Sequence, residues 1–336
     1  MKNHGASASA VLIRIGASVL LALGPVLLTM GNAAGQGEYP TRTVRLLLGF
    51  AAGTAPDVAA RLLGDKLSQG WGKPVVIENA IGASGNIAGE RVARAEPDGH
   101  TLLLAANSGI VINPNLYEKM SYDPIKDLAP ISLVYSYPNV LVVHKDVPAN
   151  SVQELVALAR ARPGALTFAS AGAGTTVHLA GEMLRSMARI DIQHVPYRGA
   201  VNLAPDLIAG RVNIFFGPTS AMLPLAREGK VRALAVSSSK RYVGAPHLPT
   251  MAECGFPEFD ITVWWGLMAP AGTPSAVIQM LHRETARILA LPEMRKRFDD
   301  IGIEPVGSSP AEFSAVITAE LPKWAKVIRE AGVRLD

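Results

Sequence analysis

The chain has 336 residues, of which 49% are hydrophobic and 18% charged, and its formal net charge is +4. This composition favours a globular protein with enough apolar material for about two cores. The basic residues are mostly spread singly, and the densest run, at 295–297, is typical of a solvated helix face, so no nucleic-acid partner is expected. The single cysteine, Cys254, excludes an internal disulfide.

The first 34 residues are typical of a secretory signal peptide. Basic residues precede an apolar stretch at 15–30, and small residues follow it at 31–35. This pattern predicts cleavage near Ala33 or Ala34 and a periplasmic location. The alternative is a retained membrane anchor, which the glycines and proline inside the apolar stretch disfavour.

Apolar runs alternate with helical patterns along most of the remaining chain. The predicted strands are 44–50, 74–78, 101–105, 131–143, 166–169, 192–195, 212–216, 231–236 and 261–269. The predicted helices are 56–69, 86–95, 152–160, 177–187, 200–209, 221–228, 276–289, 292–299 and 310–331. This alternation predicts an α/β fold with mainly parallel sheets that are buried on both faces.

The apolar run at 131–143 contains Pro138 and has no helical period. A proline is unfavourable inside a central strand but acceptable where a chain leaves one sheet for another. We therefore expect a crossing between two domains here, with a return within 236–263 and a cleft between the domains. The predicted domains are 38–138 with 255–336 for the first, which is discontinuous, and 139–254 for the second.

One local design occurs three times: an apolar run, a stretch of small residues, and then a helical segment. It begins at Val44, Leu166 and Val212. Small residues after a buried strand let a ligand approach the backbone, and the helix that follows directs its free N–H groups at that ligand. Ordinary strand–helix connections are the alternative for any one of them. The repetition favours a pocket that holds an anion.

The loop at 49–57 carries the strongest pattern of the three. Thr54 and Asp57 are three residues apart, which fits a capping box with Pro56 early in the helix. Capping alone is one interpretation. The functional interpretation adds that Phe50 and the small residues form a floor with exposed amides. A P-loop is excluded because no Gly-Lys-Ser/Thr follows.

The loop at 170–176 is rich in glycine but lacks the third glycine of a dinucleotide fingerprint. Ser170 and Thr175 can offer hydroxyls to a carboxylate, and Thr175 can cap the next helix. His178 lies in the first turn of that helix. A packed or capping role is favoured over a ligand contact for this histidine, and both remain open.

Polar residues also follow two other predicted strands. Asn107 and Ser108 follow the strand at 101–105, and Tyr197 and Arg198 follow the strand at 192–195. Arg198 could bind a carboxylate with two hydrogen bonds or form a surface ion pair, and both remain open. Trp264 and Trp265 are interpreted as core side chains rather than as a cleft wall.

Catalytic patterns find little support in the chain. The histidines are scattered without a metal-ligand spacing, and the segment 82–85 is not a nucleophile elbow. We therefore predict no catalytic residue, no metal and no cofactor, and no enzymatic reaction.

The chain resembles the Bug-type periplasmic solute receptors of tripartite tricarboxylate transporters, from about Tyr39 to the C-terminus. The resemblance rests on matching segments at 49–61, 77–104, 113–124, 169–182, 194–199, 229–241 and 270–274, among them GFAAGTAPDVAAR and ASAGAGTTVHLAGE. It implies a two-domain, Venus-flytrap-like fold that clamps a small carboxylate through backbone amides and ordered water, with the first and second loops as the chief contacts. It further implies closure about a hinge and presentation to membrane transporter subunits. We expect a monomer.

The resemblance implies a set of ligand-binding residues. They are Phe50, Ala51, Gly53, Thr54, Asp57, Asn107, Ser108, Ser170, Thr175 and Tyr197. The chain departs from many relatives at Thr54, where they have glycine, and at Gly217, where they have an acidic residue. The second departure disfavours a ligand with an ammonium group. The leading functional alternative is a periplasmic receptor that acts through a signalling partner rather than for uptake.

Overall fold

The computed structural model describes residues 39–172, 174–197 and 203–334. The chain divides into two units, 1–41 and 42–336, and every helix and strand described here belongs to the second. The signal peptide predicted for residues 1–34 lies outside the described residues, as does Arg198. Within the described ranges no helix combines the length and the apolar character needed to cross a membrane.

The strands and helices follow the predicted alternation. The strands are β1 (Val44–Leu48), β2 (Val75–Asn79), β3 (Thr101–Ala106), β4 (Leu128–His144), β5 (Leu166–Ser170), β6 (Ile192–Pro196), β7 (Ile214–Pro218), β8 (Val231–Val236), β9 (Thr262–Pro270) and β10 (Glu304–Pro305). The helices are α1 (Ala55–Trp71), α2 (Asn86–Ala93), α3 (Asn113–Leu116), α4 (Val152–Ala161), α5 (Thr176–Ala188), α6 (Leu203–Ile208), α7 (Thr219–Arg227), α8 (Ser275–Leu289), α9 (Pro292–Asp300) and α10 (Pro310–Ala331).

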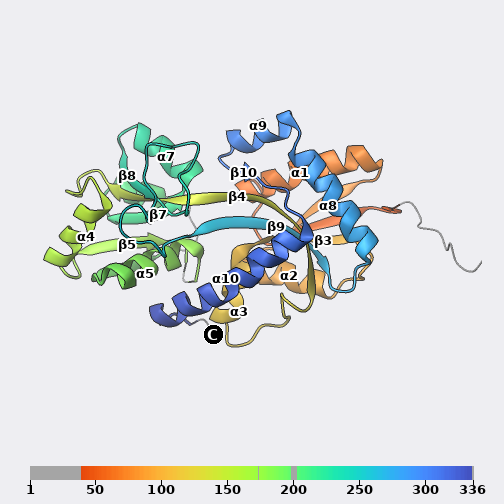
Figure 1. Cartoon of the computed structure of the whole chain (residues 1–336), viewed down its shortest axis with the longest axis horizontal. Coiled ribbons are helices and arrows are strands. Elements are labelled where there is room, and N and C mark those ends of the chain that lie inside the picture. Colours follow the sequence, from red (N-terminus) through yellow and green to blue (C-terminus); the bar gives the residue numbers. More distant parts are fainter. Residues whose placement is uncertain (1–38, 173, 198–202, 335–336) are drawn as a thin grey trace, which may run out of the picture. The chain divides into compact units, whose positions relative to one another are not determined.

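The strands are hydrogen-bonded in the order β2-β1-β3-β9-β4-β7-β5-β6, and β8 and β10 also pair with β4. Pairing is parallel among β1, β2 and β3 and among β5, β6 and β7. It is antiparallel wherever β4 or β9 takes part. The predicted α/β class is confirmed, but the prediction of mainly parallel sheets needs correction. The long strands β4 and β9 connect the two parallel groups and run antiparallel to their neighbours, so the sheet is mixed (Figure 1).

Pro138 lies where β4 changes its partners. Up to Pro138 the strand pairs with β9, and from Asn139 and Val140 onward it pairs with β7 and β8. A proline has no N–H to donate, so it is tolerated where the partner strand changes. The chain returns to the first group between the end of β8 at Val236 and the start of β9 at Thr262.

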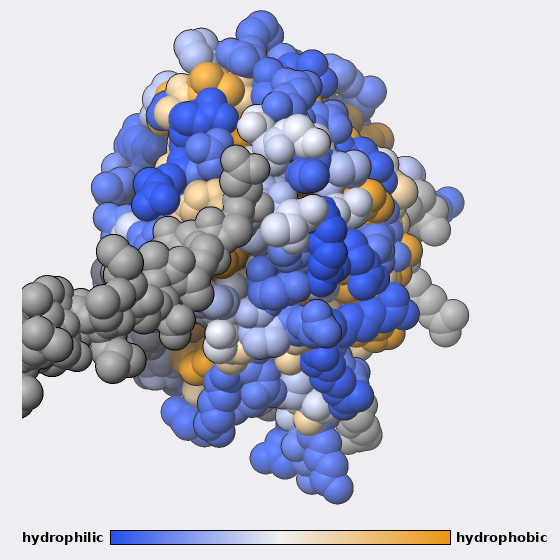
Figure 2. All heavy atoms as spheres, turned by 90° about the vertical axis from the view of Figure 1, so that its right-hand side faces the viewer, coloured by the Kyte–Doolittle hydropathy of each residue, from blue (hydrophilic) through white to orange (hydrophobic). Residues whose placement is uncertain are grey.

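Helices α8 and α10 pack against β4, and α10 also contacts α5. The buried side chains of α10 recur at helical spacing on one face, which explains this placement; they are Phe313, Ile317, Trp324, Val327 and Ile328. At the end of the second unit near α1 and α8, hydrophilic residues predominate on the surface and hydrophobic ones are scattered (Figure 2). Buried apolar side chains therefore hold the sheet and its helices together, and polar loops are left at the ends of the strands.

Candidate functional site

The first loop, residues 49–57, follows the carboxyl end of β1 and leads into α1. The ring of Phe50 lies edge-on to Trp265, with the ring centroids 4.8 Å apart. The carbonyl of Phe50 accepts a hydrogen bond from Asn79 Nδ2 at 2.9 Å. The ring contact with Trp265 and the hydrogen bond from Asn79, at the end of β2, therefore fix the position of Phe50 in the loop.

The backbone of the first loop is open to solvent. Ala51, Gly53 and Thr54 are exposed, and Gly53 has a φ of 79°, a conformation that favours glycine. The N–H groups in the first turn of a helix have no partner within the helix, and the positive end of the helix dipole lies there. The start of α1 therefore offers backbone donors to an anion.

Asp57 is only 2% exposed, and its carboxylate is occupied by the protein itself. It accepts hydrogen bonds from Gly53 N at 2.9 Å and Asn79 Nδ2 at 3.0 Å, and from Arg61 Nε and Nη2 at 2.9 and 3.0 Å. Burial alone would raise the pKa of this carboxyl, but the bonds from Arg61, Gly53 and Asn79 lower the pKa to about 2. Asp57 therefore orients the first loop through its protein partners.

The capping box predicted from Thr54 and Asp57 is wrong. Thr54 stands at the N-cap, but its hydroxyl donates to the carbonyl of Ala51 at 2.6 Å and makes no cap bond. The Asp57 carboxylate reaches Gly53 N instead of Thr54 N. The physical reason is that Arg61, one turn further along α1, draws the carboxylate toward itself.

The second loop, residues 170–176, joins β5 to α5. Ser170 is fully buried, and its hydroxyl accepts from Gly172 N at 3.2 Å. Thr175 caps α5 as predicted, since its hydroxyl oxygen accepts from His178 N at 3.4 Å while the hydroxyl donates to the carbonyl of Gly172 at 2.7 Å. These short-range bonds fold the loop over the start of α5.

Two histidines support the second loop from beneath. His178 is 3% exposed, and its Nδ1 accepts from Gly174 N at 3.1 Å, which confirms the packed role favoured for it. His194 Nε2 shares a hydrogen bond of 2.7 Å with the hydroxyl of Ser170. The two imidazole rings are stacked with centroids 4.0 Å apart. Sequence reasoning did not single out His194, although its position on β6 next to β5 was the available signal.

The surroundings of the second loop favour the neutral form of His194. Burial lowers the pKa of His194 to about 4, and the neighbouring His178 contributes in the same direction. Glu182 Oε1 lies 3.6 Å from His178 Nε2, and Arg185 forms an ion pair with the same carboxylate. Burial opposes ionisation of Glu182, but the hydrogen bonds from His178 and Arg185 lower its pKa.

The other predicted site residues lie at the ends of β3 and β6. Asn107 is fully buried; its Nδ2 donates to the carbonyl of Thr262 at 3.2 Å, and its Oδ1 has no partner among the described residues. Ser108 is buried and contacts the carbonyl of Ser84 at 3.5 Å. Tyr197 directs its hydroxyl to Asp206, to which it donates at 2.8 Å.

Sequence reasoning missed Asn139, the first residue of β4 to pair with β7. Its side chain is fully buried, and neither Nδ2 nor Oδ1 has a partner among the described residues. Its backbone N donates to Ser237 Oγ at 2.9 Å, so the residue is held firmly while its amide remains available. An asparagine inside an apolar run, directly after a proline, was the signal that could have found it.

The strand pairing brings Phe50, Asn107 and Asn139 to one region, here called the crossover edge. Trp265, which supports Phe50, pairs with Ala106 next to Asn107. Thr262, which accepts from Asn107, pairs with Pro138 next to Asn139. Both tryptophans, Trp264 and Trp265, are buried as predicted. No hydrogen bond joins the first loop to the second among the residues whose placement is described, so the two loops are positioned separately.

Loops of small residues follow the carboxyl ends of two strand groups that long strands connect, and solved structures with this fold are periplasmic binding proteins. The solved structure of Rpa4515 from R. palustris with adipate matches with a TM-score of 0.79 and 36% identity over 88% of this chain and 99% of that one. MatC from Rhodopseudomonas palustris with bound malate matches with a TM-score of 0.75 and 31% identity over 86% of this chain and 100% of that one.

The chain belongs to the tripartite tricarboxylate transporter family of receptors (TctC), whose model matches residues 59–333. Protein BugT of Bordetella pertussis is 35% identical over 320 residues, which cover 94% of this chain and 98% of BugT. The resemblance seen in the sequence is thus confirmed, and this family consists of solute-binding receptors.

Proposed function

We propose that this protein captures a small organic carboxylate at the crossover edge and delivers it to the membrane subunits of a tripartite transporter. The observation that carries the proposal is Asn139, a fully buried amide whose donor and acceptor atoms have no partner among the described residues. A buried polar group left unpaired costs about 1–3 kcal/mol, so a bound ligand that pairs with it gains that stabilisation.

The starts of two helices support a carboxylate rather than a neutral ligand. The small residues of the first loop expose the first-turn amides of α1, and the second loop leads in the same way into α5. Charge complementarity at helix starts favours a negative group, and no metal ion is needed for it.

The relatives support the same chemistry. Two solved structures of similar proteins hold adipate and malate, which are both dicarboxylates. In this chain Gly217 lies on β7, and a Cβ atom there would come within 2.4 Å of Phe215 and 2.5 Å of Met222. A side chain at that position would have to displace both of these side chains, and the lack of a carboxylate at Gly217 disfavours a ligand that carries an ammonium group.

The remaining parts of the proposal concern location and movement. We infer that residues 1–34 direct export to the periplasm and are removed, and that the mature chain acts as a monomer without catalysing a reaction. We assign residues 38–138 and 255–336 to one domain and 139–254 to the other. The site residues proposed from the sequence then close on the ligand from both domains.

A thermal-shift and calorimetric screen of the mature protein tests the proposal. Mono-, di- and tricarboxylates, including adipate and malate, are compared with amino acids. A ligand at a hundred times its dissociation constant stabilises the fold by about 2.7 kcal/mol. Tight binding of an amino acid, with none of any carboxylate, would contradict the proposed ligand class.

The variant Asn139→Asp gives the sharper test, because it keeps the shape of the side chain and places a negative charge against the ligand. We expect at least a tenfold loss of carboxylate affinity, which corresponds to about 1.4 kcal/mol. Asn115→Asp, on α3, is the matched control. Unchanged affinity in a folded Asn139→Asp protein would remove Asn139 from the site.

A further inference from the structure

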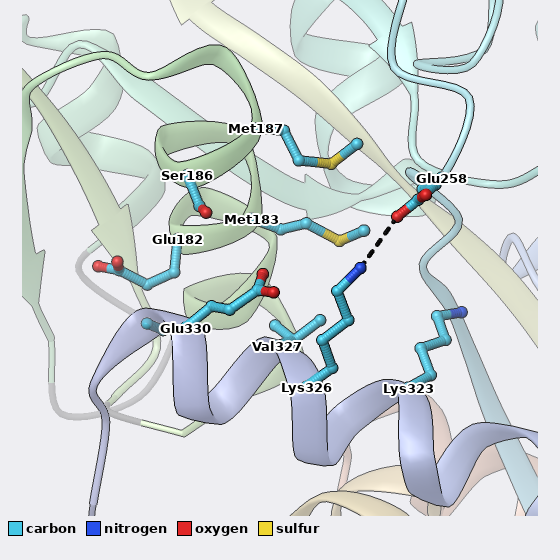
Figure 3. A pocket seen from close by; sticks show the side chains of 10 residues that line it. Glu182, Met183, Ser186, Met187, Glu258, Lys323, Lys326, Val327 and Glu330 are labelled. Atoms are coloured by element: carbon cyan, nitrogen blue, oxygen red, sulfur yellow. Dashed lines mark hydrogen bonds and ion pairs between the residues drawn. The ribbon is translucent and has the colours of Figure 1, made fainter.

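Two grooves outside the crossover edge differ in how their charges are satisfied. The first, of about 310 Å³, lies between α5 and α10, and Met183, Met187 and Val327 contribute its apolar wall (Figure 3). Its lysines are paired within the protein: Lys326 lies 3.2 Å from Glu258, an interaction drawn as a dashed line, and Lys323 lies 4.0 Å from Asp260. Because both lysines of this groove are paired with carboxylates of the protein, they do not favour an acidic partner there.

The second, here called the α7 groove, is lined by α7, β8, the segment 245–248 and Lys145 after β4. Its volume is about 450 Å³. Leu223, Val231 and Leu248 form an apolar floor and are at most 7% exposed. Three alanines stand among them, and their small side chains hollow the surface; they are Ala226, Ala233 and Ala245.

The charged residues that line the α7 groove are all basic: Lys145, Arg227 and Arg232, with His247 beside them. Lys145 is paired with Asp146 at 2.7 Å. The nearby Lys230, outside the groove lining, is paired with Glu228 at 2.6 Å. The two arginines thus carry the excess charge of this surface.

Backbone carbonyls are the partners of both arginines. Arg232 Nη1 donates to the carbonyls of Val147 and Ala149 at 2.8 and 3.2 Å, and Arg227 Nη2 donates to that of Gly244 at 3.5 Å. Across the described ranges neither guanidinium has a carboxylate within 4.0 Å. A carbonyl satisfies a donor but does not neutralise a charge, so the groove keeps positive potential beside an apolar floor.

Arg227 also borders a neighbouring cavity that contains Asp299 and Asp300. Asp300 is paired with Lys296 at 2.9 Å. These carboxylates line that neighbouring cavity and do not line the α7 groove. The charged side chains that an acidic partner meets in the groove lining are therefore all basic.

We propose that the α7 groove docks an acidic segment of a partner protein, in which carboxylates flank an apolar side chain. The inference rests on the proposed function, because a membrane subunit of the transporter is then the source of that segment. The hollow shape favours an inserted peptide side chain over a lipid surface, since a flat bilayer meets protruding groups first and the floor residues are recessed. Charge complementarity sets the encounter rate and burial of the apolar side chain sets the residence time.

Fluorescence anisotropy with a short labelled peptide of alternating glutamate and leucine tests this docking. We expect measurable binding to the full mature protein that weakens as salt is raised. Arg227→Gln is expected to weaken binding at least about fivefold. Lys230→Gln removes the same charge outside the groove and is the matched control, expected to change binding by less than about twofold. Melting curves and carboxylate titrations of both variants check the fold and the ligand site.

Four outcomes would overturn the docking proposal. The first is no peptide binding at millimolar concentration, and the second is an equal loss of peptide affinity in Arg227→Gln and Lys230→Gln. The third is equal binding of a peptide with glutamine in place of glutamate. The fourth is Arg227-dependent binding of anionic phosphatidylglycerol vesicles that displaces the peptide. The last outcome would assign the surface to a membrane instead. If no carboxylate binds while the peptide still does, the proposed function fails and the docking surface stands.

Discussion

The two loops before α1 and α5 look alike in sequence but are held by different chemistry. The first depends on one ionised carboxylate, Asp57, which receives bonds from Arg61, Asn79 and Gly53. The second depends on hydroxyls and on the imidazoles of His178 and His194. Each arrangement fixes the turn that precedes a helix, and only the first contributes a full negative charge of its own.

The comparison shows that a loop of small residues is held in place by side chains that lie outside the loop, such as Arg61 and Asn79 in the first and His194 in the second. In the first loop, charge supplies strong bonds that persist to low pH. In the second loop, hydroxyls and imidazole nitrogens supply weaker bonds, and burial lowers the pKa of His194 so that its ring stays neutral at neutral pH. The two loops are therefore expected to respond differently to substitution and to acid.

The largest expected effect comes from Asp57→Ala, which leaves Gly53 N and Asn79 Nδ2 without their acceptor. We expect the free energy of unfolding to fall by about 3 kcal/mol, measured by urea denaturation. Asp65→Ala, an exposed carboxylate on the same helix, is the control, with a change within about 0.5 kcal/mol. Similar values for the two variants would show that the carboxylate does not hold the first loop.

Gly49→Ala tests how closely the first loop is packed. A Cβ at residue 49 would come within 2.4 Å of the Cα of Gly85, a backbone atom that cannot turn away. We expect a loss of about 2 kcal/mol in unfolding free energy.

Gly53→Ala is the companion variant, because nothing lies within 4 Å of a Cβ there and only the φ of 79° is strained. Its expected cost is about 1 kcal/mol. Denaturation curves of both proteins, measured together, separate crowding from strain. A larger loss for Gly53→Ala than for Gly49→Ala would contradict the packing seen here.

Acid is expected to weaken the second loop first. The folded pKa of His194 is about 4, below the unfolded value of 6.5, so the unfolded chain binds the proton first and stability falls as pH drops from 6.5 to 4. With allowance for partial exposure, the loss is about 2 kcal/mol. The charged and titratable groups facing this ring are those of His178, Glu182 and Arg185.

The first loop is expected to hold longer in acid. The pKa of Asp57 is lowered to about 2, so its contribution is complete above its unfolded value near 4 and is lost as pH falls from 4 to 2. Unfolding free energies measured from pH 8 to pH 3 should therefore fall between pH 6.5 and 4 in the parent protein. This fall should be absent in His194→Gln. An equal fall in both proteins would show that another group causes it.

The smallest effect is expected at Thr54. Thr54→Ala removes one exposed bond to the carbonyl of Ala51 and should cost about 0.5 kcal/mol. Calorimetry with the bound carboxylate would then separate stability from affinity. A loss of several kcal/mol would mean that the hydroxyl supports the first loop as strongly as Asp57 does.

Much of the fold could be predicted from local pattern alone. The predicted strand at 166–169 became Leu166–Ser170 and the predicted helix at 177–187 became Thr176–Ala188. Periodicity and helix caps act between near neighbours, and a single sequence records them well. The capping role of Thr175 was predictable for the same reason.

The prediction was wrong where distant segments compete for the same group. The capping box failed because Arg61 and Asn79 take the Asp57 carboxylate, and Asn79 is 22 residues away. The mainly parallel sheet failed because β4 and β9 pair antiparallel across a long separation in sequence. His194 was missed because its partner, Ser170, lies on another strand.

The sequence by itself determined the order of strands and helices, the small-residue loops before α1 and α5, and membership of the receptor family. These depend on local periodicity and on long matching segments. Only the tertiary structure decided that the Asp57 carboxylate bonds to groups of the protein and that the Asn139 amide has no partner among the described residues. The reason is physical: the partners of a buried polar group are set by which strands meet when the sheet closes, and no local pattern encodes that meeting.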